Sequence, residues 1–132
     1  MLLKRLMYLA IVMTFVVALT PVAPASAAPA CTISYSAQND WGAGATMNVN
    51  IINSGTTAVN GWTLTWTFPG NQQITNLWNA SFTQTGRSVS VTDAGWNGTI
   101  AAGGTAGFGF NLSYSGANAA PASFSLNGTA CR

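Results

Sequence analysis

The sequence predicts an all-β protein, an antiparallel sandwich of two sheets of the jelly-roll or immunoglobulin-like kind. Apolar and polar residues alternate through short stretches, and turn residues separate these stretches. The alternation is clearest in 61–68 and 107–114, where one face is aromatic or aliphatic and the other carries Thr, Gly, Asn or Ser. Shorter stretches with the same period are 47–51, 89–91 and 124–126. Because pairs such as Asn-Gly, Thr-Gly and Gly-Gly lie between them, we expect about seven or eight short strands and no helix.

The first 27 residues have the pattern of a secretory signal peptide. Lys4 and Arg5 precede the apolar stretch 6–19, and a small-residue cleavage site ends at Ala27. A membrane anchor is the alternative, but prolines follow the apolar stretch before it reaches the roughly 20 residues that span a bilayer. We therefore expect an exported, extracellular protein whose residues 28–132 form one domain without membrane contact.

Cys31 and Cys131 are the only cysteines, and they lie at opposite ends of the predicted domain. In an oxidising compartment the simplest arrangement is a disulfide between them. That disulfide would close almost the whole domain into a loop and hold its two ends side by side. Two free thiols are the alternative.

Charge is almost absent from the predicted domain. Outside the signal peptide it has Arg87 and Arg132 against Asp40 and Asp93, and the whole chain has no histidine. Without a basic surface we expect no contact with nucleic acid. Without histidine or a cysteine cluster we expect no metal site and no cofactor. A neutral monomer is the predicted form.

Asp40 and Asp93 are the only residues available for the carboxyl pair of a glycoside hydrolase. Alternation directs Asp40 away from Trp41, and no apolar residues surround either carboxyl group to raise its pKa. Without histidine, a copper-dependent oxidative enzyme and a Ser-His-Asp triad are also excluded. The sequence therefore predicts a non-catalytic protein with no catalytic residues.

The five tryptophans form two groups. Trp62 and Trp66 share the apolar face of 61–68 and are predicted to lie in the core, with a position at the edge of the core as the alternative for Trp66. Trp41, Trp78 and Trp96 occur among polar residues and glycines, so we expect them to be exposed. An indole offers a flat apolar face that matches the C–H face of a β-linked sugar ring. A polysaccharide is therefore the predicted ligand, and a protein partner is the alternative.

Four sequence stretches closely resemble the bacterial family 2 carbohydrate-binding modules that are attached to actinomycete cellulases and xylanases. They are VNGWTLTWTFP (59–69), WNGTI (96–100), GGTAGFGFN (103–111) and FSLNGTAC (124–131). The resemblance implies a disulfide-closed β-sandwich that adsorbs to crystalline cellulose without catalysis, through a flat strip of exposed tryptophans. The residues that it assigns to binding are Trp41, Trp78 and Trp96, with Asn39, Asn48, Asn76 and Asn111 beside them.

The resemblance also bears on the choice of ligand. Xylan binders of this kind carry an arginine soon after the first surface tryptophan, and Gly44 stands at that position here. Cellulose is therefore the expected ligand, with xylan or chitin as alternatives. Gly107 stands where a polar residue is frequent, so one hydrogen bond to the ligand is expected to be missing. The chain ends one residue after Cys131, which suggests a free-standing module or the truncated binding domain of a secreted glycoside hydrolase.

Overall fold

The computed structural model of the protein describes residues 14–18 and 30–132. Residues 14–18 are exposed and belong to no helix or strand. Most of the predicted signal peptide, its cleavage site at Ala27 and the predicted domain start at residue 28 lie outside the described residues. Among the described residues, no helix has the length and apolar character needed to cross a membrane.

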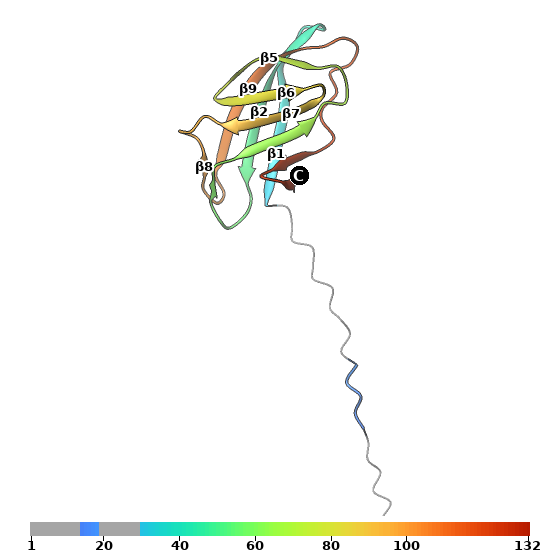
Figure 1. The fold of residues 1–132 in the computed structure, drawn as a ribbon, viewed down its shortest axis with the longest axis vertical. Coiled ribbons are helices and arrows are strands. Elements are labelled where there is room, and N and C mark those ends of the chain that lie inside the picture. The colour runs from blue at the N-terminus through green and yellow to red at the C-terminus, as the bar shows by residue number, and fades with distance from the viewer. Residues whose placement is uncertain (1–13, 19–29) are drawn as a thin grey trace, which may run out of the picture.

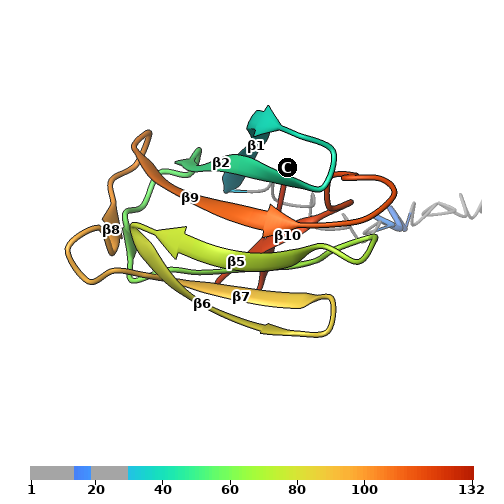
Figure 2. The same cartoon turned by 90° about the horizontal axis from the view of Figure 1, so that it is seen from above.

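Strands make up the regular structure of residues 30–132 and form two stacked antiparallel sheets (Figures 1 and 2). In spatial order, the first sheet contains β1 (Cys31–Asp40), β2 (Gly44–Asn53), β9 (Thr105–Ser113) and β5 (Gln73–Trp78). The second sheet contains β11 (Thr129–Cys131), β10 (Phe124–Leu126), β4 (Thr63–Thr67), β7 (Ser88–Asp93) and β6 (Ala80–Thr85). A short ladder joins β3 (Val59–Asn60) to β8 (Thr99–Ile100).

The predicted all-β sandwich is confirmed, although residues 30–132 contain more strands than the sequence suggested. Strands β3 and β8 have two residues each, which is too short for any periodic signal. Alternation accounts for the longer strands because successive side chains point to opposite faces of a sheet. In β4, for example, the odd-numbered threonines face solvent while Leu64 and Trp66 are buried.

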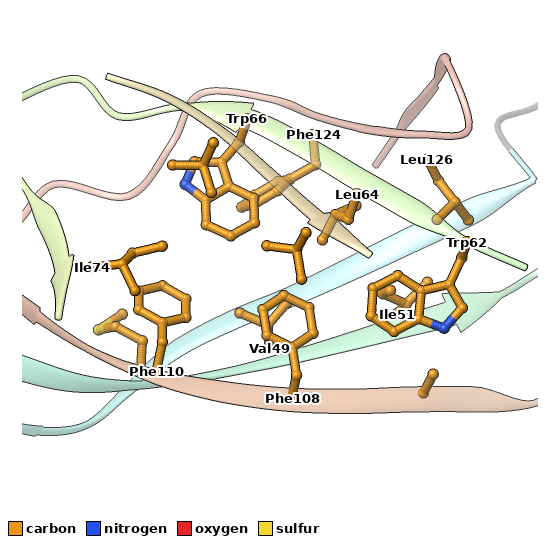
Figure 3. Close-up of a cluster of buried hydrophobic side chains, with 14 of the residues drawn as sticks. Val49, Ile51, Trp62, Leu64, Trp66, Ile74, Phe108, Phe110, Phe124 and Leu126 are labelled. Atoms are coloured by element: carbon orange, nitrogen blue, oxygen red, sulfur yellow. The ribbon is translucent and has the colours of Figure 1, made fainter. Parts of the chain in front are cut away.

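Aromatic rings from both sheets fill the core between the layers (Figure 3). Trp62 stacks on Phe108 with ring centroids 5.8 Å apart, and Trp66 stacks on Phe110 at the same distance. The side chain of Trp66 is only 4% exposed and also packs against Phe124, so it lies inside the core and not at its edge. Both tryptophans that were predicted to be buried are therefore buried.

A disulfide between Cys31 and Cys131 joins the two ends of the domain, as predicted. It spans 100 residues, and it links β1 of the first sheet to β11 of the second. Two backbone hydrogen bonds reinforce this junction: Ile33 donates to the carbonyl of Arg132, and Arg132 donates to the carbonyl of Cys31. The sandwich is therefore closed covalently at one end.

Replacing both cysteines with serine should lower the free energy of unfolding by about 4–5 kcal/mol, because an open chain of this length gains that much loop entropy when it unfolds. Urea denaturation followed by tryptophan fluorescence measures the change. The unaltered protein in excess dithiothreitol should show the same lowered midpoint. An unchanged midpoint in both samples would contradict a structural role for the disulfide.

Candidate functional site

Three large apolar side chains are exposed on the surface formed by residues 30–132. The exposed fractions are 56% for Trp41, 37% for Trp78 and 76% for Trp96. These are the three tryptophans that the sequence predicted to be exposed. Each is placed by a different local structure: the β1–β2 turn, the end of edge strand β5, and the loop between β7 and β8.

Trp41 begins the tight turn between β1 and β2. Its backbone N–H donates to the carbonyl of Gly44 at 3.0 Å, and Gly42 within the turn has φ of 90°, a conformation that favours glycine. The indole lies against the backbone of Gly44: a Cβ atom at that position would come within 2.7 Å of Cζ2 of Trp41. Only glycine leaves room for the ring in this position.

The side chain of Asp40 stabilises the same turn. One carboxylate oxygen accepts hydrogen bonds from the Tyr114 hydroxyl at 2.5 Å and from the Gly42 N–H at 2.9 Å, and the other accepts from the Asn118 amide. The Tyr114 hydrogen bond, followed by the other two, lowers the pKa of Asp40 below its ordinary value, and the same bond raises the pKa of Tyr114. Asp40 is therefore an ionised anchor of the turn.

Trp78 lies across a second glycine. It ends β5 and pairs with Gly109 of β9. A Cβ atom at Gly109 would come within 2.4 to 2.6 Å of three neighbouring ring atoms, Cζ2, Cε2 and Nε1. The indole therefore covers the backbone of Gly109 on the outer face of the first sheet.

A β-bulge in each edge strand determines which polar residues reach this outer face. In β1 the register shifts between Ala37 and Asn39, and in β5 it shifts between Ile74 and Asn76. An extra residue reverses the alternation beyond it. Asn39 therefore points outward although Ala37, two residues earlier, pairs with the buried Met47.

The two bulges align four polar side chains in one row across the sheet. The pairings run from Asn39 to Thr46, from Thr46 to Asn111, and from Asn111 to Asn76. The Thr46 hydroxyl donates to Oδ1 of Asn111 at 2.6 Å, and Nδ2 of Asn111 donates to Oδ1 of Asn76 at 2.9 Å. This polar row lies between the turn that carries Trp41 and the Trp78–Gly109 pair.

Asn48 lies in the next row, opposite Gly109, and its amide donates to the side chain of Gln38 at 3.4 Å. One row further, Gly107 pairs with Asn50, whose Oδ1 lies 2.8 Å from the position of a Cβ atom on Gly107. A larger residue at 107 would displace that amide. The polar side chains of this row are therefore those of Asn50 and of its partner Ser34, and Gly107 contributes none.

Trp96 projects from a loop that is tied to the core and to the end of β5. Asn97 makes these links. Its carbonyl accepts a hydrogen bond from Nε1 of the buried Trp62 at 2.9 Å, and its Nδ2 donates to the carbonyl of Asn79 at 2.7 Å. Within the loop, its Oδ1 accepts from the N–H of Ala94. Asn79 directly follows Trp78. The loop that carries Trp96 is therefore bound to the turn beside Trp78.

Asp93 closes the base of the same loop. Its carboxylate accepts from the backbone N–H groups of Trp62 and Gly95, each at 2.9 Å, and these bonds lower its pKa. Neither Asp93 nor Asp40 has the raised pKa that a general acid in glycoside hydrolysis needs. Both carboxylates instead position the loops that carry tryptophans.

Comparisons with known proteins identify the family of the chain. The family model described as "Cellulose binding domain" matches residues 31–131. The chain belongs to this family. Exoglucanase A of Cellulomonas fimi is 46% identical over 101 residues, which cover 76% of this chain but 12% of that enzyme. The chain therefore corresponds to a small part of this relative, and the module itself is a non-catalytic carbohydrate-binding domain.

Solved structures of the family have the same fold. The chitin-binding domain of Chi18aC from Streptomyces coelicolor superposes with a TM-score of 0.64 at 36% identity, covering 77% of this chain and 94% of that one. The cellulose-binding family 2 domain from ScLPMO10C gives 0.59 at 26% identity, covering 80% and 97%. The solved structures similar to this chain thus include one described as a cellulose-binding domain and one described as a chitin-binding domain.

The structure brings most of the predicted site residues together. Asn39, Asn76 and Asn111 share the polar row, Asn48 lies beside Trp78, and Trp96 is linked to them through Asn97. Thr46 and Gln38 also reach this face, and neither was among the residues predicted from the sequence. Alternation could have placed Thr46 on the outer face, because it is two residues from Asn48 in the same strand. No sequence pattern could have placed Gln38 there, because it is the extra residue of a bulge.

Substituting alanine for Gly109 should tilt the indole of Trp78, because the new methyl group would occupy the space of ring atoms. We expect adsorption to the polysaccharide ligand to weaken by about tenfold, with the melting temperature changed by only a few degrees, about 2–6 °C. Gly103→Ala is a control for backbone strain alone, since its Cβ would meet nothing within 4 Å but its φ of 76° disfavours alanine, so it should lower the melting temperature without weakening adsorption. Unchanged adsorption of Gly109→Ala would contradict a role for the ring orientation.

The stability of the module should be insensitive to pH from about 5 to 9, because no side chain of residues 30–132 titrates there. It should fall in acid. The folded-state pKa values of Asp40 and Asp93 lie below the ordinary 3.8, so the stability they contribute is complete above pH 3.8 and is lost as the pH falls below it. Thermal melts between pH 2 and 9 test this, with Asp93→Asn expected to show a shallower acid decrease. A transition near neutral pH would contradict it.

Proposed function

We propose that the module adsorbs to crystalline cellulose through Trp41, Trp78 and Trp96, with no cofactor and no catalysis. The observation that supports this most strongly is the exposure of three indoles on a nearly uncharged surface. Burying an exposed indole against a sugar ring removes apolar area from water and matches the ring's electron-rich face to polarised C–H groups. A neutral surface suits a neutral polysaccharide because no charge has to be desolvated.

The spacing of the rings favours an extended, repeating ligand. Trp41 lies over Gly44, which pairs with Ser113, and Trp78 lies over Gly109. These two positions are four residues apart along β9, which corresponds to about 13 Å. A single sugar cannot contact both rings, whereas a polysaccharide surface offers several contacts at once, and weak contacts made together give useful avidity.

Asn39, Asn48, Asn76 and Asn111 are proposed to hydrogen-bond the hydroxyl groups of the same ligand. The row linking Thr46, Asn111 and Asn76 is already ordered by internal hydrogen bonds, so little side-chain entropy remains to be lost on binding. Each amide keeps donor or acceptor capacity beyond these bonds. The amides thus provide orientation while the rings provide most of the affinity.

Chitin is the second candidate ligand, because the relative with the 0.64 TM-score is described as a chitin-binding domain. Xylan is less favoured, because the glycine at position 44 allows Trp41 to lie against the sheet. In the cell, we propose that residues 1–27 direct export and that the module works extracellularly beside polysaccharide-degrading enzymes. Exoglucanase A contains a related segment within a much longer chain.

Alanine substitution of Trp41, Trp78 or Trp96 should each weaken adsorption to microcrystalline cellulose by about tenfold or more, because stacked aromatic contacts contribute roughly 1–3 kcal/mol each. Depletion assays on cellulose, chitin and insoluble xylan measure the loss and rank the ligands. Melting temperatures should change little for Trp41 and Trp96, which are mostly exposed, and somewhat more for Trp78, which is 37% exposed and packs on Gly109.

Trp78→Phe is the matched control, because it retains a flat ring and should retain most of the adsorption. Trp62→Ala should instead destabilise the fold by about 3–5 kcal/mol, because it removes a buried ring. Adsorption that is unaffected by all three surface substitutions would refute the proposed site. Strong binding to chitin with none to cellulose would refute the proposed ligand.

A further inference from the structure

The outer face of the second sheet carries a regular array of hydroxyl groups. Every second residue of β4, β7 and β6 is Ser or Thr, and these side chains point away from the core. Strand register aligns them in rows, one containing Ser125, Thr65, Ser90 and Thr83. Neighbouring hydroxyl groups within a row are about 4.8 Å apart, the spacing of paired strands.

This face is hollowed into a groove of about 740 Å³. Thr65, Thr67, Thr83 and Ser90 contribute to its lining, with Ser123 on the β10 side. Trp66 also borders the groove but is buried beneath it, so no exposed aromatic ring is available there for stacking. The groove therefore differs chemically from the outer face of the first sheet, where Trp41 and Trp78 lie.

Within residues 30–132, one cation, Arg87, borders the groove. It is the second residue of the two-residue hairpin turn between β6 and β7. Gly86, the first residue, has the positive φ, 60°, that such hairpin turns need at that position. The guanidinium Nη1 donates to the carbonyl of Pro69 at 3.2 Å, which holds the side chain beside the groove. A guanidinium has five N–H donors, so four further donors are available.

Among the residues that the structure describes, no carboxylate lines this groove to balance that charge. The two carboxylate side chains of residues 30–132 are used elsewhere: Asp40 bonds to Tyr114 and Asp93 to Trp62. The hydroxyl groups of the groove suit a ligand that is itself rich in hydroxyl groups. Arg87 has no counter-charge, so it suits a carboxylate on that ligand, because a guanidinium and a carboxylate form paired hydrogen bonds.

We propose that this groove is a second glycan-binding site, and that its ligand is a polysaccharide chain bearing uronic acid groups. The uronate binds Arg87, and the neutral sugars exchange hydrogen bonds with the Ser and Thr hydroxyl groups, each of which can donate and accept. The site lies on the opposite sheet from Trp41 and Trp78 and shares no residue with the surface proposed to bind cellulose. One module could then bridge a neutral and an acidic polysaccharide.

The test is an NMR titration of the ¹⁵N-labelled protein with a glucuronic acid-substituted xylo-oligosaccharide and with the unsubstituted oligosaccharide of the same length. We expect about tenfold tighter binding of the acidic one, the contribution of a single paired charge. Resonance shifts should occur in Thr65, Thr83, Ser90 and the Arg87 side chain. Raising NaCl from about 0.05 to 0.5 M should reduce the preference several-fold.

Arg87→Gln should abolish the preference for the acidic oligosaccharide, Arg87→Lys should retain part of it, and Trp78→Ala should leave it intact. Adsorption of Arg87→Gln to cellulose checks that the fold is preserved and separates this proposal from the cellulose proposal. Equal affinities of the unaltered protein for the two oligosaccharides would overturn the proposal of a second glycan-binding site. So would shifts confined to the exposed tryptophans, or equal shifts with sodium phosphate alone.

Discussion

The position of the exposed rings depends on the close approach of two indoles to glycine backbone. Trp41 and Trp78 lie on the outer face of the first sheet because Gly44 and Gly109 have no side chain beneath them. Glycine in a strand weakens the strand and contributes nothing to packing. The neighbouring core residues compensate for this: Phe108 and Phe110, on either side of Gly109, are buried among the aromatic rings of the opposite sheet (Figure 3).

A second dependence links the core to the most exposed ring. Trp62 is buried, yet both of its N–H groups bond to the loop that carries Trp96, one to Asp93 and one to the carbonyl of Asn97. The same loop is tied to Asn79, beside Trp78. A loop held at both ends by hydrogen bonds can present a large apolar side chain to solvent in a defined position. Such preorganisation reduces the entropy lost on binding.

The two outer faces of the sandwich have different chemistry although they arise from the same alternation. The first sheet exposes asparagines and indoles, and the second exposes threonines and serines beside one arginine. Both faces are compatible with carbohydrate, but by different interactions: stacking on one, and hydrogen bonding with a single charge on the other. The near absence of other charges leaves Arg87 as a distinctive feature of its face.

The amino-acid pattern alone determined the fold class, the disulfide, and which tryptophans are buried or exposed. Each of these follows from residue type and a period of two, which are local properties. The tertiary structure decided which asparagines share a row and which glycines lie under which rings. Ile74 and Asn76 have the same alternation phase, yet Ile74 is 9% exposed and Asn76 faces solvent, because a bulge between them shifts the register. A bulge is set by hydrogen-bond pairing with a strand distant in the sequence, so local alternation cannot locate it.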